Sequence, residues 1–267
     1  SLGANTTADN NTAVGYHSML ANTTGSNNSG LGSGALDANT TGIDNTAVGS
    51  GALTTATTAS ENTAVGRQSL LLNTTGGCNT AVGSASLKSN TTASSNTGVG
   101  YQSLFSNTTG AQNTALGRDT LFSNTTGNCN VSVGYLSLFS NTEGNNNVAI
   151  GRNALNANTT ANNNTAVGFC TLISNTTGCH NIAIGTQTMD ANTTGVRNIA
   201  IGHAAMGNST TSNNSQAIGY SALSSQTTGC QNTAVGTSSL TANTTGSNNM
   251  AIGISSLFSN TEGSNNI

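Results

Sequence analysis

A unit of 17 residues repeats through the chain. Written in rows of 17 from Asn11, the sequence aligns without insertion or deletion as a partial row 1–10, fifteen complete rows 11–265 and a partial row 266–267. The consensus row is N-T-A-V-G-x-x-S-L-x-S-N-T-T-G-x-x, and we number its positions slot 1 to slot 17. A short fixed period predicts a solenoid, in which each repeat forms one coil stacked on the next. We expect residues 1–267 to be a single continuous array and, since both ends fall inside a row, part of a longer one.

Some slots hardly change from row to row. Slot 3 is always Ala, Gly or Ser, slot 9 is always Leu or Met, and slot 13 is always Thr. Slot 4 is always aliphatic and is predicted to form an internal core ladder of Leu31, Leu116, Val14, Val48, Val65, Val82, Val99, Val133, Ile150, Val167, Ile184, Ile201, Ile218, Val235 and Ile252. Slot 5 is always Gly, which indicates a turn with a positive φ or a close approach of the next coil. The turn glycines include Gly15, Gly49, Gly66, Gly83, Gly100, Gly117, Gly134, Gly151, Gly168, Gly185, Gly202, Gly219, Gly236 and Gly253.

These patterns predict an all-β fold, a β-solenoid (β-roll) of 17-residue coils with two short strands per coil, near slots 1–4 and 8–11. The turns would lie at the slot-5 glycine and at Asn-Thr-Thr-Gly, and Asn and Thr would form hydrogen-bonded ladders along the axis. In the first strand, slots 2 and 4 face one way and slot 3 the other. Because slot 4 is aliphatic and slot 3 is small, both faces are predicted to be buried. The partner on one face would most simply be another copy of the chain, giving a homo-oligomer or filament.

Composition excludes several classes of protein. With only 5 basic and 8 acidic residues and a net charge of −3, the chain offers no cationic surface for nucleic acid or an anionic membrane. No apolar run approaches the roughly 20 residues that a membrane span needs. Disorder usually combines low hydrophobicity with high net charge, whereas 34% of these residues are hydrophobic. An ordered, uncharged repeat protein is therefore expected.

The rows Asn11-Thr-Ala-Val-Gly, Asn181-Ile-Ala-Ile-Gly-Thr-Gln-Thr and Asn198-Ile-Ala-Ile-Gly-His-Ala-Ala resemble the head repeats of trimeric autotransporter adhesins of the YadA type. Those heads carry an Asn-x-x-Ala-[Ile/Val]-Gly-x-x-[Ser/Ala] motif, and the likeness covers about half of each row. Rows that end in Asn-Thr-Thr-Gly also look like those of phage tail-fibre proteins and uncharacterised bacterial surface proteins. The resemblance implies three chains that each form a left-handed β-roll and pack around one axis.

Asn-Thr-Thr also fits the N-glycosylation sequon. The candidate acceptors are Asn5, Asn22, Asn39, Asn73, Asn90, Asn107, Asn124, Asn158, Asn175, Asn192 and Asn243. The alternative is turn chemistry, which Asn and Thr also favour. Slot 14, where the sequon requires Ser or Thr, becomes Glu at Glu143 and Glu262, whereas slot 13, which the sequon leaves free, never changes. A structural role for the slot-13 threonine therefore explains the motif better than glycan attachment, although Thr-rich turns would also accept O-linked sugars.

Threonine ladders also raise the possibility of ice binding, because a flat grid of Thr on one β-face can order water. Slots 13 and 14 are adjacent, so their side chains would not share a face. Slot 2 is interrupted by aliphatic residues, so no wide Thr plane is expected.

Cysteines and aromatic residues occupy variable slots. The cysteines are Cys78, Cys129, Cys170, Cys179 and Cys230. Those in equal slots lie three coils apart, roughly 14 Å, too far for a disulfide, so they are predicted to be exposed substitutions, with pairing between chains as the alternative. The aromatic residues lie in slots 6 and 10, as Tyr16, Tyr101, Phe105, Phe122, Tyr135, Phe139, Phe169, Tyr220 and Phe258. Three of them occupy slot 10 of consecutive rows, where local stacking is favoured over a contact patch.

No catalytic residue, metal ligand or cofactor is predicted. His17, His180 and His203 lie in three different variable slots, and the acidic residues are scattered singly. The run Gly30-x-Gly32-x-Gly34 looks like a phosphate loop only out of register with the repeat.

We therefore expect a non-enzymatic structural protein that forms an extracellular or cell-surface fibre, as the shaft or head of a filament or adhesin, with host-cell, matrix or glycan surfaces as further partners. The alternatives are a receptor-binding phage tail-fibre shaft and an ice-binding β-solenoid.

Overall fold

The computed structural model describes residues 2–267, and contacts divide the chain into two compact units, Ser1–Asn130 and Val131–Ile267. In both units each coil contains one strand of three residues at slots 2 to 4. The predicted all-β solenoid with a 17-residue spacing is thereby confirmed. Residues 2–267 contain no helix, so none that is long and apolar enough to cross a membrane.

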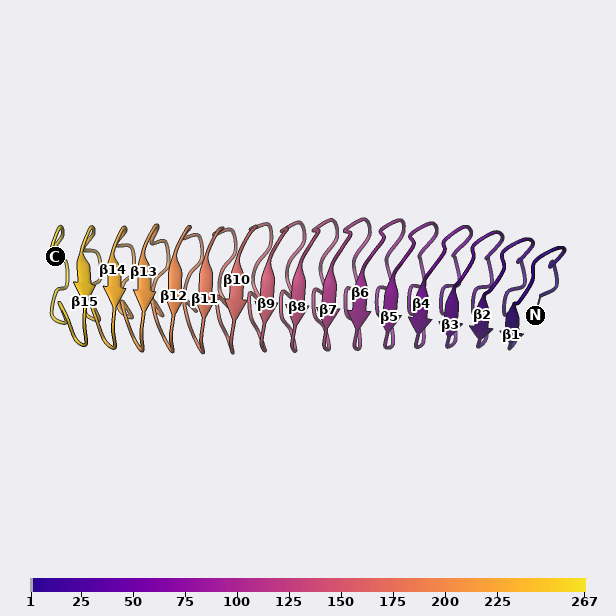
Figure 1. Cartoon of the computed structure of the whole chain (residues 1–267), viewed down its shortest axis with the longest axis horizontal. Helices are drawn as coiled ribbons and strands as arrows, with labels where there is room; N and C mark the ends of the chain where they lie inside the picture. The colour runs from indigo at the N-terminus through magenta and orange to yellow at the C-terminus, as the bar shows by residue number, and fades with distance from the viewer. Residues whose placement is uncertain (1) are drawn as a thin grey trace. The chain divides into compact units, whose positions relative to one another are not determined.

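In the first unit, seven strands pair in parallel and in chain order, as the side-by-side arrows of Figure 1 show. Equivalent slots pair throughout, so that Thr63 lies opposite Thr80 and Val65 opposite Val82. The strands are β1 (Thr12–Val14), β2 (Ser29–Leu31), β3 (Thr46–Val48), β4 (Thr63–Val65), β5 (Thr80–Val82), β6 (Thr97–Val99) and β7 (Thr114–Leu116).

The second unit repeats the same arrangement with eight strands, each parallel to the next (Figure 1). They are β8 (Val131–Val133), β9 (Val148–Ile150), β10 (Thr165–Val167), β11 (Ile182–Ile184), β12 (Ile199–Ile201), β13 (Gln216–Ile218), β14 (Thr233–Val235) and β15 (Met250–Ile252). The in-register pairing aligns every slot into a column along its unit, which is what turns a sequence repeat into ladders.

The prediction of a second strand at slots 8–11 is wrong, because the backbone there turns repeatedly. Slots 7 and 9 both adopt left-handed conformations, as at Gln102 (φ 53°) and Leu104 (φ 52°). Such residues interrupt an extended chain, and Leu gives no sequence signal for them because it rarely adopts a positive φ. The segment still bonds from coil to coil: the Leu104 N–H donates to the carbonyl of Thr120 at 2.9 Å. Hydrogen bonding between coils thus continues without a regular strand.

The slot-5 glycine has the role that the sequence predicts. Gly49 has a φ of 131°, and a Cβ built on it would lie 2.6 Å from the carbonyl oxygen of Gly66 in the next coil. Both the dihedral angle and the close approach therefore require glycine at this turn.

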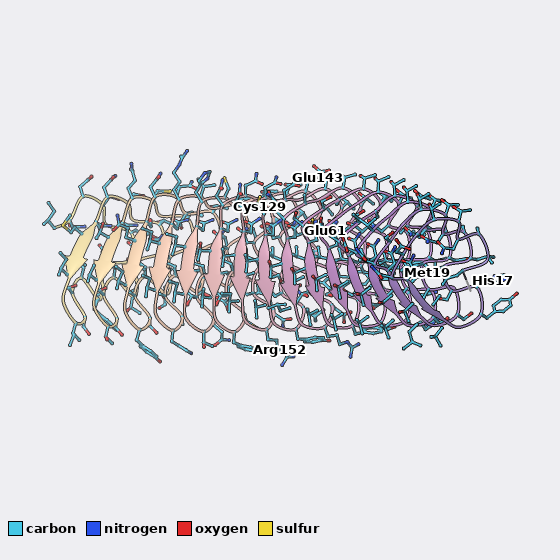
Figure 2. The ribbon with its side chains drawn as sticks, turned by 45° about the vertical axis from the view of Figure 1, so that its right-hand side comes forward. His17, Met19, Glu61, Cys129, Glu143 and Arg152 are labelled. Atoms are coloured by element: carbon cyan, nitrogen blue, oxygen red, sulfur yellow. The ribbon has the colours of Figure 1, made fainter. Side chains whose placement is uncertain are left out.

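The core consists of slots 3, 8 and 9, of which slot 8 is Ala, Ser or Thr and so contributes buried hydroxyl groups as well as methyl groups. The slot-3 side chains are buried in all but the first strand, and the largest fully buried side chains are the slot-9 residues Met19, Leu36, Leu53, Leu70, Leu87, Leu104, Leu121, Leu138, Leu155, Leu172, Met189 and Met206. Figure 2 labels Met19 as one of this series. Slot 9 therefore forms the main apolar ladder inside the coils.

Two ladders of buried asparagine complete the interior. In slot 1, the Asn96 N–H donates to Asn79 Oδ1 at 3.0 Å, and Asn96 Nδ2 donates to the Gly110 carbonyl at 2.9 Å. In slot 12, Asn107 Nδ2 donates to Asn90 Oδ1 at 2.8 Å and to the Gly110 carbonyl at 2.9 Å. Each coil thereby satisfies buried amides with the coil before it, as the predicted axial ladders require.

Candidate functional site

The outward face of the strands, made of slots 2 and 4, is the most prominent apolar surface of both units. The predicted internal core ladder at slot 4 is wrong for the single chain, because all of these side chains are exposed or half-buried. The exposed ones range from 36% of full exposure at Val82 to 69% at Ile252, and comprise Val14, Leu31, Val82, Val99, Leu116, Ile150, Ile184, Ile201, Ile218 and Ile252. The half-buried ones are Val48, Val65, Val133, Val167 and Val235.

The reason for this inversion is that the interior is already full. Slot 3 points inward, where slots 8 and 9 occupy the space. A Cβ built on Gly98 would lie 2.7 Å from Ser86 Oγ and 3.0 Å from Ser103 Oγ. Only a small side chain fits there, so alternation along the strand sends the aliphatic slot 4 outward.

The two units differ at slot 2, which shares the outward face with slot 4. In β1 to β7, slot 2 is Thr in six strands and Ser29 in the other. In β8 to β15 it is apolar in five strands, as Val131, Val148, Ile182, Ile199 and Met250. The first unit therefore presents a Thr column beside an aliphatic column, and the second presents two largely apolar columns. Exposed apolar columns of this regularity are unusual on the surface of a single protein chain.

The structure places nearly all of the sequon asparagines inside the coils. Their exposed fraction is 0% at Asn22, Asn39, Asn73, Asn90, Asn107, Asn124, Asn158, Asn175, Asn192 and Asn243. Their Nδ2 atoms, to which an N-linked sugar would be attached, donate to the slot-15 carbonyl three residues on, as in the slot-12 ladder above. A glycan on these atoms cannot coexist with the folded coil, so the prediction of N-glycosylation is wrong for them. Asn5 is exposed and is the exception.

The turn-chemistry alternative is confirmed, and so is the structural role of the slot-13 threonine. Thr108 Oγ1 donates to the Thr125 carbonyl at 3.0 Å, and Thr91 Oγ1 donates to the Thr108 carbonyl at 3.1 Å. This ladder of side-chain bonds follows the axis at the Asn-Thr-Thr turn. It explains why slot 13 is invariant.

Aromatic and basic side chains stack along the variable slots. The rings of Phe105 and Phe122 lie 5.0 Å apart with an interplanar angle of 3°, and the Lys88 ammonium lies 5.4 Å from the Phe105 ring centre. In the second unit, the Arg152 guanidinium lies 6.0 Å from the Tyr135 ring centre and 5.7 Å from that of Phe169. The predicted stacking is thus confirmed for the slot-10 pair, and cation–π contacts extend it in slot 6.

Cysteine and other ionisable side chains form no composite site in the part of the chain that is described. All five cysteines are free thiols; Cys78 and Cys129 are exposed and the other three are half-buried. The neighbouring Glu61, whose Oε2 accepts a hydrogen bond from Cys78 Sγ at 3.3 Å, raises the pKa of that thiol. Residues 2–267 contain no pocket and no group of three or more His, Cys, Asp or Glu that could hold a metal ion.

Sequence reasoning missed the slot-1 asparagines Asn28, Asn45, Asn62, Asn79, Asn96, Asn113, Asn130, Asn147, Asn164, Asn181, Asn198, Asn232 and Asn249 as a buried ladder. The signal was available, because slot 1 is Asn in every complete row except at Ser215, while exposed polar slots vary freely. Invariance of a polar residue within a repeat indicates burial with satisfied hydrogen bonds as readily as it indicates a turn.

The geometry defines the class of the protein as a β-solenoid built from 17-residue coils. No protein-family model matches the chain, and no curated protein matches its sequence. The adhesin-like motif therefore stays a resemblance.

Proposed function

We propose that the chain is a non-enzymatic structural protein that assembles with copies of itself into an extracellular or cell-surface fibre. The observation that carries the proposal is the outward face of slots 2 and 4, a column of aliphatic side chains that the single chain leaves in contact with solvent. Covering these side chains is favourable by about 25 cal/mol for each Å² of apolar surface removed from water.

A second copy of the chain is the partner that fits this face best. The columns contain no charged side chain, and their spacing within each unit is set by the coil, which a second copy reproduces without mismatch. Identical repeats pair in register along their whole length, so a weak contact in each coil is multiplied by the number of coils.

The extracellular setting rests on the motif resemblance and on the composition. Only 5 basic and 8 acidic residues are present, and Asn and Thr ladders carry the polar interactions within the coils. A shaft or head of an adhesin and the shaft of a phage tail fibre both fit such a scaffold. Neighbouring genes for secretion or for capsid proteins would separate these two settings.

The experiment compares assembly of the wild type with that of a double variant, Val99→Asp and Val167→Asp. Both side chains lie on the outward face, Val99 exposed and Val167 half-buried in the single chain, so the charges would be fully buried only where two chains meet. The matched control places the same charges at slot 17, as Ser95→Asp and Asn163→Asp, where the side chains are exposed on another side of the coil.

Sedimentation velocity and electron microscopy should show filaments or oligomers for the wild type and the control, and single chains for the outward-face variant. Circular dichroism should be the same for all three. Wild-type chains that stay monomeric at all accessible concentrations, or an outward-face variant that assembles normally, would contradict the proposal.

Ice binding is a second candidate, because the Thr column of β1 to β7 faces outward beside the slot-4 column on one sheet. The sequence interpretation excluded a wide Thr plane, yet slot 2 is unbroken by aliphatic residues within this unit. Thermal hysteresis measured on dilute wild-type protein tests this candidate directly. A freezing point that equals the melting point rules it out.

A further inference from the structure

The second threonine of the Asn-Thr-Thr turn forms an exposed column at slot 14. It is Thr in fourteen of sixteen rows and Glu in the other two, Glu143 and Glu262. Every one of these side chains is exposed, and Figure 2 shows Glu143 on the outer edge of its coil. The threonines are Thr7, Thr24, Thr41, Thr58, Thr75, Thr92, Thr109, Thr126, Thr160, Thr177, Thr194, Thr211, Thr228 and Thr245.

The threonine hydroxyl groups at slots 13 and 14 differ in their hydrogen bonding. At slot 13 the hydroxyl donates to the next coil, as Thr108 Oγ1 does to the Thr125 carbonyl. Over residues 2–267, no slot-14 threonine hydroxyl has a hydrogen-bond partner in the chain. Slot 14 therefore keeps a hydroxyl group that contributes no bond to the fold.

Nothing inside the coil explains why slot 14 is retained. Slots 6 and 17 are largely exposed as well, and they have diverged to many residue types. Glu143 and Glu262 show that the backbone at slot 14 does not need a β-branched side chain. The constraint on this slot therefore acts from outside the chain.

The constraint is not the N-glycosylation sequon. Where slot 12 loses its asparagine, at Ala56, Ser209 and Gln226, slot 14 stays Thr. Where slot 14 becomes Glu143, slot 12 keeps Asn141. The two slots vary independently, and the sequon asparagines are buried, so the retained group is the threonine hydroxyl itself.

We propose that the slot-14 threonines are acceptors for O-linked sugars, transferred by a separate glycosyltransferase from a phosphate-activated sugar. In each transfer a bond forms between threonine Oγ1 and the sugar C1 atom, and the bond between C1 and the donor phosphate oxygen breaks. The hydroxyl proton passes to a base of the transferase, and the phosphate-bearing group leaves with the electron pair. This inference does not depend on the fibre role.

The exposed turn fits attachment of sugars at slot 14 better than it fits a second copy of the chain, or ice, packed against that slot. The column projects from a corner of the coil, with slot 15 buried and slot 17 exposed beside it. A close-packed partner would have to bury the Glu143 carboxylate, which costs several kcal/mol if the charge is left unpaired. For an array of attached sugars, by contrast, Glu143 only removes one acceptor hydroxyl group at that coil.

The test is site mapping on the protein isolated from its native source. Peptides from a protease of broad specificity are analysed by mass spectrometry with electron-transfer fragmentation, which leaves sugars attached. Alkaline β-elimination provides a second readout: it removes the Cα proton, breaks the Cβ–Oγ1 bond and leaves a double bond at each modified residue. We expect sugar masses on slot-14 threonines and none on slot-13 threonines or slot-12 asparagines.

Two neighbouring variants, produced in the native source, give a matched comparison. Thr109→Val should lose the sugar at that position and unfold like the wild type, because its hydroxyl bonds nothing in the chain. Thr108→Val should keep the sugar at position 109 and unfold at lower denaturant concentration, because it loses the bond to the Thr125 carbonyl. Unmodified slot-14 threonines in the native protein, or sugars on slot 13 instead, would overturn the proposal.

Discussion

The slot-12 asparagine ladder has a natural defect at Ala56, and its repair should stabilise the protein. Asn39 Nδ2 donates to Asn22 Oδ1 at 2.7 Å, but Asn39 Oδ1 is buried without a partner because the next slot-12 residue is Ala56. The Ala56→Asn substitution would place an amide where the other coils have one. Its Nδ2 would reach Asn39 Oδ1 and the Ala59 carbonyl, and its Oδ1 would accept from Asn73 Nδ2.

The repeat itself supplies the precedent for this geometry. Asn90 stands in a coil that also has Ala in slot 15, and its Nδ2 donates to the Ala93 carbonyl and to Asn73 Oδ1, both at 2.9 Å. Three new hydrogen bonds contribute about 1 kcal/mol each, and ordering the new side chain costs about 1 kcal/mol. The expected net gain is about 1–3 kcal/mol in the free energy of unfolding.

Urea unfolding followed by circular dichroism measures this gain. Asn107→Ala is the matched control, because it creates in an intact stretch the same defect that Ala56 makes naturally, and it should cost about 2–4 kcal/mol. Hydrogen exchange of the amides around Asn39 would localise both effects. If Ala56→Asn folds but gains no stability, the ladder does not stabilise the coil as described.

Three further predictions follow from the geometry of the coil. Gly49→Ala should lower the free energy of unfolding by more than about 3 kcal/mol, because strain at a positive φ adds to a clash with the next coil. Gly253→Ala has nothing within 4 Å of its Cβ position and should lose only the strain of about 1–3 kcal/mol. Thermal unfolding of both variants compares the two losses. Leu104→Ala should cost about 2–5 kcal/mol and Val99→Ala less than about 1 kcal/mol, since only the first leaves an internal cavity, and equal losses in urea unfolding would show that the assignment of inner and outer faces is wrong. Burial raises the pKa of Asp190, so the ionised carboxylate destabilises the folded state above that pKa, and this destabilisation disappears as the pH falls through it. Asp190→Asn should therefore stabilise the chain at neutral pH by less than about 1 kcal/mol, because solvent screens the charge. A stability gain that persists unchanged at acidic pH would refute this explanation.

The period, the coil and the slot-5 turn could be read from the sequence because each depends on spacing and on glycine. Which face of the strand is buried could not be read in the same way. In Thr-Ala-Val, alternation separates Ala64 from Val65 but does not say which side is the interior, and hydrophobicity alone favours the wrong residue, the larger Val65. Burial is decided by the volume that slots 8 and 9 already fill.

The irregular half of the coil was unpredictable for a different reason. Left-handed residues are usually signalled by Gly or Asn, yet slot 9 places Leu and Met in that conformation, as at Leu104 and Met189. The strain is sustained by burial of the side chain and by bonds to the next coil, which are properties of the stack. The sequence indicates that the Thr-rich turns could accept O-linked sugars, but it does not separate slot 14 from slot 13, because only the structure shows which hydroxyl groups are already bonded.

The most direct test of the fibre proposal is electron cryo-microscopy of the assembled protein at a resolution that shows side chains. The proposal predicts that chains meet through slots 2 and 4, so that Val99 and Val167 are buried between copies. Contacts made through other slots, with these two side chains facing solvent, would contradict it.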